Sequence, residues 1–109
     1  MSKAIYIQKG DTIDFVNETE KLIESGEIIN LSTRIAVAGC DINPKEIGTL
    51  HLTGIYEMPK NENETIDFGK FVYLNSDGKI TLETAENENV FAGLAVETSQ
   101  GTTIKVRIQ

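Results

Sequence analysis

The sequence predicts a small single-domain all-β fold, built from two similar β units with little or no helix. Its 14 Ile, 11 Thr and 6 Val outnumber its 7 Leu and 6 Ala, and β-branched residues suit a pleated sheet better than a helix. Short apolar runs are separated by nine glycines and by many Asn, Asp and Ser residues, as in small sandwiches and barrels. A residue pattern also occurs twice, which indicates that the fold repeats itself.

Alternating apolar residues predict the positions of the strands. The clearest strand is Thr103–Ile108, whose three apolar residues are expected to face the core while Lys105 and Arg107 face solvent. Strands are also expected to hold the three tyrosines. Loops are expected at residues 41–46, 59–64 and 84–89, of which 59–64 is too polar to belong to the core. The other alternating pairs are Ile5/Ile7, Ile13/Phe15, Ile35/Val37, Leu50/Leu52, Ile80/Leu82 and Leu94/Val96.

A hairpin is expected where Asp77-Gly78 separates two apolar runs, Phe71–Leu74 and residues 80–82. Asp-Gly between apolar runs is a strong hairpin signal, because the glycine takes a positive φ without a steric cost. Gly78 is therefore predicted to be a structural turn residue.

Residues 17–26 could alternatively form a helix. Asn17 could cap its N-terminus, Glu20 could complete a capping box, and Gly26 could follow its end. Only Leu22 and Ile23 would then face a core, which is a thin apolar stripe. A strand, turn and strand are favoured here because of the repeat.

The repeat has the form I-x-x-G-x-x-(I/V)-x-L and is found at residues 23–31 and 66–74. Gly26 and Gly69 are the predicted turn glycines of the two copies. Further along, Ala36-Val37 aligns with Ala95-Val96, and Gly48-Thr49 aligns with Gly101-Thr102. Each match alone could arise by chance, but three matches in the same order favour a duplicated β unit.

Length and charge limit the function. The 109 residues fit one β domain over residues 1–109, with residues 1–4 as a flexible N-terminal arm. The net charge of −7 disfavours a nucleic acid or an anionic membrane as partner. A single cysteine excludes an intramolecular disulfide.

The sequence contains no strong motif for a catalytic, phosphate-binding or metal-binding site. Neither Gly69-Lys70 nor Gly78-Lys79 has the Ser or Thr and the upstream glycine of a phosphate-binding loop. His51 is expected to face solvent or an interface, and Cys40 to be a half-buried residue at a strand end rather than a reactive thiol. The acidic clusters lack the spacing of a calcium loop, which favours a solvated or partner-facing surface. We therefore expect no enzyme activity, no catalytic residue, no cofactor and no metal.

An ordered set of motifs covers nearly the whole chain. It consists of residues 8–17 (QKGDTIDFVN), Ile23-x-x-Gly26-x-x-Ile29, residues 54–60 (GIYEMPK), Ile66-x-x-Gly69-x-x-Val72-Tyr73, residues 92–96 (AGLAV) and residues 106–108 (VRI). As a set, it resembles the capsid cement, or head decoration, proteins of tailed phages and prophages.

This resemblance implies a structural virion protein that is made in the bacterial cytoplasm, binds the outside of the expanded head and stabilises the capsid. It implies a β-clip or partly open barrel, the major capsid protein as partner, and a homotrimer at least on the capsid. We expect the exposed N-terminal residues to add a strand to capsid subunits; these are Ser2, Lys3, Ala4, Ile5 and Tyr6. Two alternatives stay open: a small β module that binds a ligand or another partner, and an enzyme subunit whose site forms between chains.

Overall fold

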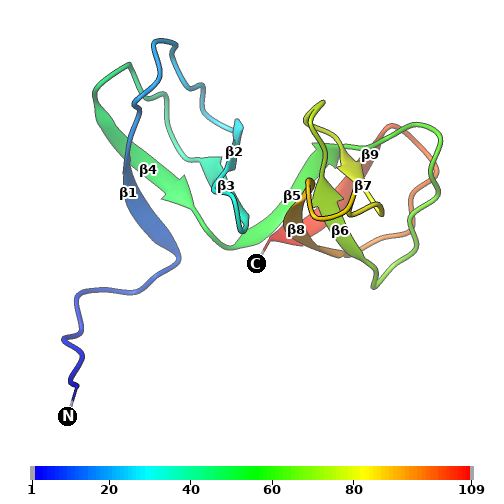
Figure 1. Ribbon diagram of the computed structural model, residues 1–109, viewed down its shortest axis with the longest axis horizontal. Coiled ribbons are helices and arrows are strands. Elements are labelled where there is room, and N and C mark those ends of the chain that lie inside the picture. The colour runs from blue at the N-terminus through cyan, green and yellow to red at the C-terminus, as the bar shows by residue number, and fades with distance from the viewer. Residues whose placement is uncertain (1, 109) are drawn as a thin grey trace.

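The computed structural model describes residues 2–108, and in these residues the chain forms nine strands and no helix (Figure 1). The strands are β1 (Thr12–Val16), β2 (Ile28–Asn30), β3 (Ile35–Ala38), β4 (Ile47–His51), β5 (Gly54–Pro59), β6 (Phe71–Leu74), β7 (Ile80–Thr81), β8 (Val90–Ala95) and β9 (Thr103–Ile108). The predicted all-β class is therefore confirmed. Met1 and Gln109, the ends of the expected domain, lie outside the described residues.

The chain completes one antiparallel sheet before it starts the next. The first sheet has the order β1-β4-β3-β2 and the second has the order β5-β9-β8-β6-β7. We call residues 12–51 the first unit and residues 54–108 the second unit. Figure 1 shows the two units side by side, with the chain crossing between them from β4 to β5. Both sheets end in free edge strands, so neither closes into a barrel.

Strand β3 joins the two units because both of its faces are buried. Ala36 and Ala38 pack in the core of the first unit, whereas Ile35 and Val37 belong to the core of the second unit. Four consecutive apolar residues are typical of a strand that is covered on both faces. The alternation predicted for β9 is also confirmed, since its three apolar residues are buried and the residues between them are exposed.

The hydrogen bonds of the two units match in pairs. Each unit has a turn glycine, Gly26 with φ 88° or Gly69 with φ 89°. The N–H of each glycine donates to an alanine carbonyl, at 2.7 Å in Ala38 and 2.8 Å in Ala95. Three further backbone bonds of the first unit have a counterpart in the second unit. The pairs are Ile23–Ile42 with Ile66–Ser99, Asn17–Glu46 with Lys60–Thr102, and Gly39–Thr49 with Val96–Lys105. The predicted duplication is thus confirmed.

These bonds also correct the alignment of the copies. Since Ala38 corresponds to Ala95, Ala36-Val37 corresponds to Gly93-Leu94, and its alignment with Ala95-Val96 is wrong. Leu50 pairs with Ala38, and Val106 pairs with Ala95, so Leu50 corresponds to Val106. Gly48-Thr49 therefore corresponds to Ile104-Lys105, and its alignment with Gly101-Thr102 is wrong as well. Hydrogen-bond register determines which strands correspond, and short Ala-Val or Gly-Thr matches do not report it.

Three further predictions concern single segments. The strand expected at Ile5/Ile7, with Tyr6 in it, is wrong: residues 2–9 form no strand, because a strand requires a hydrogen-bonded neighbour. Residues 17–26 form no helix, as favoured, but they hold bends, one bridge at Ile23 and a turn rather than the expected strand, turn and strand. The stretch 59–64 does not lie wholly outside the core, because Lys60 is 1% exposed.

Candidate functional site

Residues 2–10, which we call the arm, extend away from both units (Figure 1). Ile5, Tyr6 and Ile7 are 85, 80 and 80% exposed. Among the described residues, no backbone-to-backbone hydrogen bond ties the arm to a strand or turn. Full burial of a large apolar side chain stabilises by about 1.5–3 kcal/mol. Within the described chain, these side chains therefore gain little of this possible stabilisation.

The arm also differs from the rest of the chain in charge. It contains Lys3 and Lys9 and no acidic residue. All 17 acidic residues follow it, together with the other eight of the ten cations, so the remainder carries a net charge of −9. A cationic, apolar arm on an acidic protein is suited to contact an acidic neighbour.

A second apolar surface lies on the outer face of the second sheet. Phe71 on β6, Leu94 on β8, Arg107 on β9 and Ile55 on β5 are cross-strand neighbours in one row. Phe71 and Ile55 are each 59% exposed. In the first unit, the counterparts of Phe71 and Leu94 are Ile28 and Val37, which pack against the core of the second unit. In the second unit, Phe71 stays exposed and Leu94 is only half-buried. An exposed apolar row of this kind marks an interaction surface.

Aromatic side chains extend this row. The ring of Phe91 lies 5.8 Å from the rings of Phe71 and Tyr73, edge to face with both. Edge-to-face contacts fix the orientation of the rings and add to their burial energy. Sequence reasoning missed this face. The signal was the run Phe71–Leu74, which is apolar on both faces of the strand.

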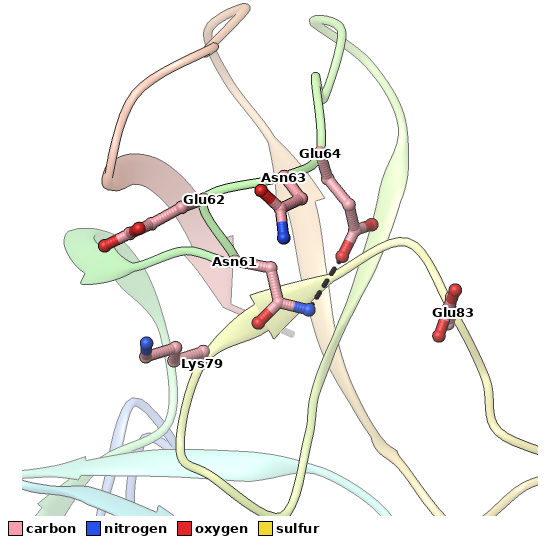
Figure 2. Close-up of a pocket in the computed structure, with 6 residues that line it drawn as sticks. All are labelled: Asn61, Glu62, Asn63, Glu64, Lys79 and Glu83. Atoms are coloured by element: carbon pink, nitrogen blue, oxygen red, sulfur yellow. Dashed lines mark hydrogen bonds between the residues drawn. The ribbon is translucent and has the colours of Figure 1, made fainter.

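A polar hollow of about 490 Å³ lies beside β7, at the edge of the second sheet (Figure 2). Its lining residues are Asn61, Glu62, Asn63, Glu64, Lys79 and Glu83. Figure 2 shows Glu62 directed away from Glu64 and Glu83, so the three carboxylates do not converge. Among the described residues, no three His, Cys, Asp or Glu side chains are placed to hold a metal ion. Those residues also include no helix that could cross a membrane.

Glu64 is the anchored residue of this hollow. Its carboxylate accepts hydrogen bonds from Thr81 Oγ1 at 2.5 Å, from the N–H of Leu82 at 2.9 Å and from Asn61 Nδ2 at 2.8 Å. Burial raises the pKa of Glu64, but these three bonds and the nearby Lys60 ammonium outweigh it and bring the pKa below its ordinary value of 4.5. The hydrogen bonds tie the loop to β7, which is a structural role.

Two buried polar side chains occupy equivalent places in the two units. In the first unit, Asn17 Nδ2 donates to the carbonyls of Lys21 at 2.7 Å and Ile42 at 2.9 Å. In the second unit, Lys60 Nζ donates to the carbonyls of Asn61 at 2.6 Å and Glu64. Buried polar groups need such partners. Through these hydrogen bonds, each side chain stabilises the turn that follows the first strand of its unit.

The remaining candidate residues do not come together as a site. His51 is half-buried and faces Gly39, where an added Cβ would lie 2.8 Å from His51 Nε2. Cys40 is exposed, so its expected half-buried position is wrong. Gly78 has φ 78° and closes the β6–β7 hairpin, where Asn75 Oδ1 accepts the N–H of Asp77 at 2.9 Å.

The arm and the apolar face of the second sheet both expose large apolar side chains, as interaction surfaces do. A model of the phage cement protein family matches residues 7–108. The chain belongs to this family. Membership associates this cement protein with a phage capsid and gives it a structural, capsid-stabilising role. No curated protein and no solved structure matches the chain.

Proposed function

We propose that this cement protein binds the outer surface of the expanded phage head, against the major capsid protein, and stabilises the shell without catalysing a reaction. The family match over residues 7–108 is the observation that carries the proposal. The protein is then a component of the virion exterior, made in the cytoplasm of the bacterial host and acting as a single domain.

The proposed capsid contact is the arm, through Ser2, Lys3, Ala4, Ile5 and Tyr6. Its support is physical: the arm presents the most exposed apolar side chains and a positive charge on an otherwise acidic chain. An extended segment of this kind binds well by adding a strand to an open sheet edge. The acidic remainder then faces solvent and keeps decorated particles apart by repulsion.

A homotrimer on the shell fits this role energetically. A ligand that binds only the mature shell stabilises it by about 2.7 kcal/mol per site at a hundredfold excess over Kd. Three arms on one trimer bind together, and this raises the avidity by orders of magnitude without new contacts. Moderate contacts by each copy are therefore sufficient.

The experiment compares the thermal release of capsid protein from expanded empty heads with and without the purified chain. The proposal predicts a higher release temperature with the full chain and no change with a variant that lacks residues 1–5. Circular dichroism and urea unfolding should show that the variant keeps its fold, because the arm contributes no strand. An unchanged release temperature with the full, folded chain would reject the proposed function.

A further inference from the structure

The first sheet has an uncovered edge at β2. The two sheets share one strand order, β1-β4-β3-β2 and β5-β9-β8-β6, but the second sheet adds β7 beyond β6. Strand β2 is the counterpart of β6 and lacks this neighbour. The Glu27 carbonyl and the Leu31 N–H bond to the β3 side. The backbone groups of Ile28 and Asn30 therefore point to the free edge, where they can accept another strand.

A groove lies beside this edge. Its volume is about 430 Å³, and its lining includes Phe15, Lys21, Leu22, Ile28, Ile29 and Asn30. Lys21 in this lining corresponds to Glu64, the residue that bonds to β7 in the second unit. The groove is thus the first unit's counterpart of the place that β7 fills.

Burial of the equivalent residues shows the effect of the missing strand. In the second unit, Val72 and Met58 are 0 and 2% exposed, and Ile80 of β7 is fully buried against the same core. In the first unit, the counterparts Ile29 and Phe15 are only half-buried. An apolar residue at the position that Ile80 occupies in the second unit would complete the core of the first unit.

We propose that the arm of a second copy of this chain adds to β2 as a fifth strand, in the place that β7 has in the second sheet. Strand β7 runs antiparallel to β6, with Ile80 opposite Leu74 and Thr81 opposite Tyr73. In the same register, Ile5 of the arm lies opposite Leu31 and fills the groove, and Tyr6 lies opposite Asn30. One backbone edge of the arm then pairs with β2, and its other edge stays open, so the arm can still pair with a capsid strand as proposed above.

Three observations favour this occupant. The arm sequence Ile5-Tyr6-Ile7 has the apolar spacing of residues 80–82 (ITL), and all three arm residues are exposed. The arm is cationic and the rest of the chain is acidic, so a neighbour attracts it. The arm leaves from β1, at the opposite edge of the sheet from β2, and Figure 1 shows it directed away from the sheet. A head-to-tail contact of this type closes into a ring when the rotation allows.

The inference does not rest on the proposed function, because arm exchange needs only a second copy of the chain and no capsid. Its test uses the purified chain without heads, so loss of arm exchange and loss of head binding are measured separately.

The first test is disulfide trapping in a Cys40→Ser background, which removes the exposed native thiol. The test variant carries Tyr6→Cys and Asn30→Cys, two exposed positions. Asn30 Oδ1 accepts the N–H of Ser32 at 2.7 Å in the β2–β3 turn, so circular dichroism is used to check that the variant keeps its fold. Residues opposite each other in a hydrogen-bonded pair have Cα atoms about 5.5 Å apart, a separation that a disulfide spans. Its matched control carries Tyr6→Cys and Tyr73→Cys, because Tyr73 is the counterpart of Asn30 and β7 already covers its edge.

The proposal predicts covalent dimers and larger species in most chains of the test variant and only background cross-linking in the control. Equal cross-linking in both variants would overturn it. Cross-links confined to single chains would overturn the assignment to a second copy.

The second test titrates a synthetic peptide of residues 2–10 into a chain that lacks residues 1–10. Nuclear magnetic resonance should show shifts in the amides of residues 28–31. A peptide with Ile5→Asp should bind about 30-fold more weakly, as expected when an isoleucine is no longer buried. Leu22→Asp, at a groove residue that is 44% exposed, should weaken binding while the chain stays folded. Shifts confined to the Phe71 and Leu94 face, or no shifts, would overturn the proposal.

Discussion

Asn17 should stabilise the first unit through its amide group, and Asn17→Ala tests this. The side chain is fully buried, and its Nδ2 bonds to the carbonyls of Lys21 and Ile42 at 2.7 and 2.9 Å. Its Oδ1 accepts the N–H of Thr19 at 3.0 Å, but Thr19 is exposed and can bond to water instead. Two donor bonds at about 1 kcal/mol each, together with a small cavity, give an expected loss of about 2–3 kcal/mol.

The control is Asn17→Asp, which keeps the acceptor to Thr19 and replaces the donor with a second oxygen. That oxygen faces the two carbonyls that the amide served, so a buried unpaired charge is created. The loss should exceed that of Asn17→Ala and reach about 3 kcal/mol or more at neutral pH.

Urea unfolding followed by circular dichroism measures both variants, with the free energy of unfolding taken from the midpoint and slope. The expected order of stability is wild type, then Asn17→Ala, then Asn17→Asp. An aspartate variant as stable as wild type would refute the reasoning, because it would show that only the local turn at Thr19 matters.

Further predictions concern the second unit. Glu64 has a lowered pKa in the folded state, so its carboxylate stabilises the protein above pH 4.5, and this contribution is lost as the pH falls through the folded pKa. The stability difference between wild type and Glu64→Gln, followed by urea unfolding, should therefore shrink below pH 4.5; a difference that does not change with pH would contradict it. Gly93→Ala should cost about 3 kcal/mol, because the new Cβ would overlap the carbonyl of Arg107. The control is Gly101→Ala, whose Cβ would meet no atom within 4 Å, and its free energy of unfolding should stay within about 0.5 kcal/mol of wild type. Equal melting temperatures for the two variants would contradict the close approach of the two strands at Gly93.

The strands that sequence reasoning located well are those with a buried face and a polar face. In β9, Lys105 and Arg107 between three buried apolar residues specify both the strand and its orientation. The β6–β7 hairpin was equally clear, because Gly78 supplies the positive φ that the turn needs. In these elements, local pattern and tertiary packing agree.

Other features depended on partners that a local pattern does not contain. Ile5 and Ile7 alternate like a strand, yet no neighbouring strand pairs with them in this chain. Lys60 lies in a polar stretch, but its ammonium reaches two carbonyls and is buried with them. The uncovered edge of β2 is recognised only when the two sheets are compared, because the sequence of β2 itself does not show that a counterpart of β7 is missing.

The most direct test of the central claim is to count the copies of this cement protein that co-sediment with expanded empty heads of its cognate phage. The proposed function predicts saturable binding, with a copy number that matches the three-fold positions of the shell and with little binding to unexpanded heads. A folded chain that fails to bind expanded heads, or that binds without saturation, would contradict it.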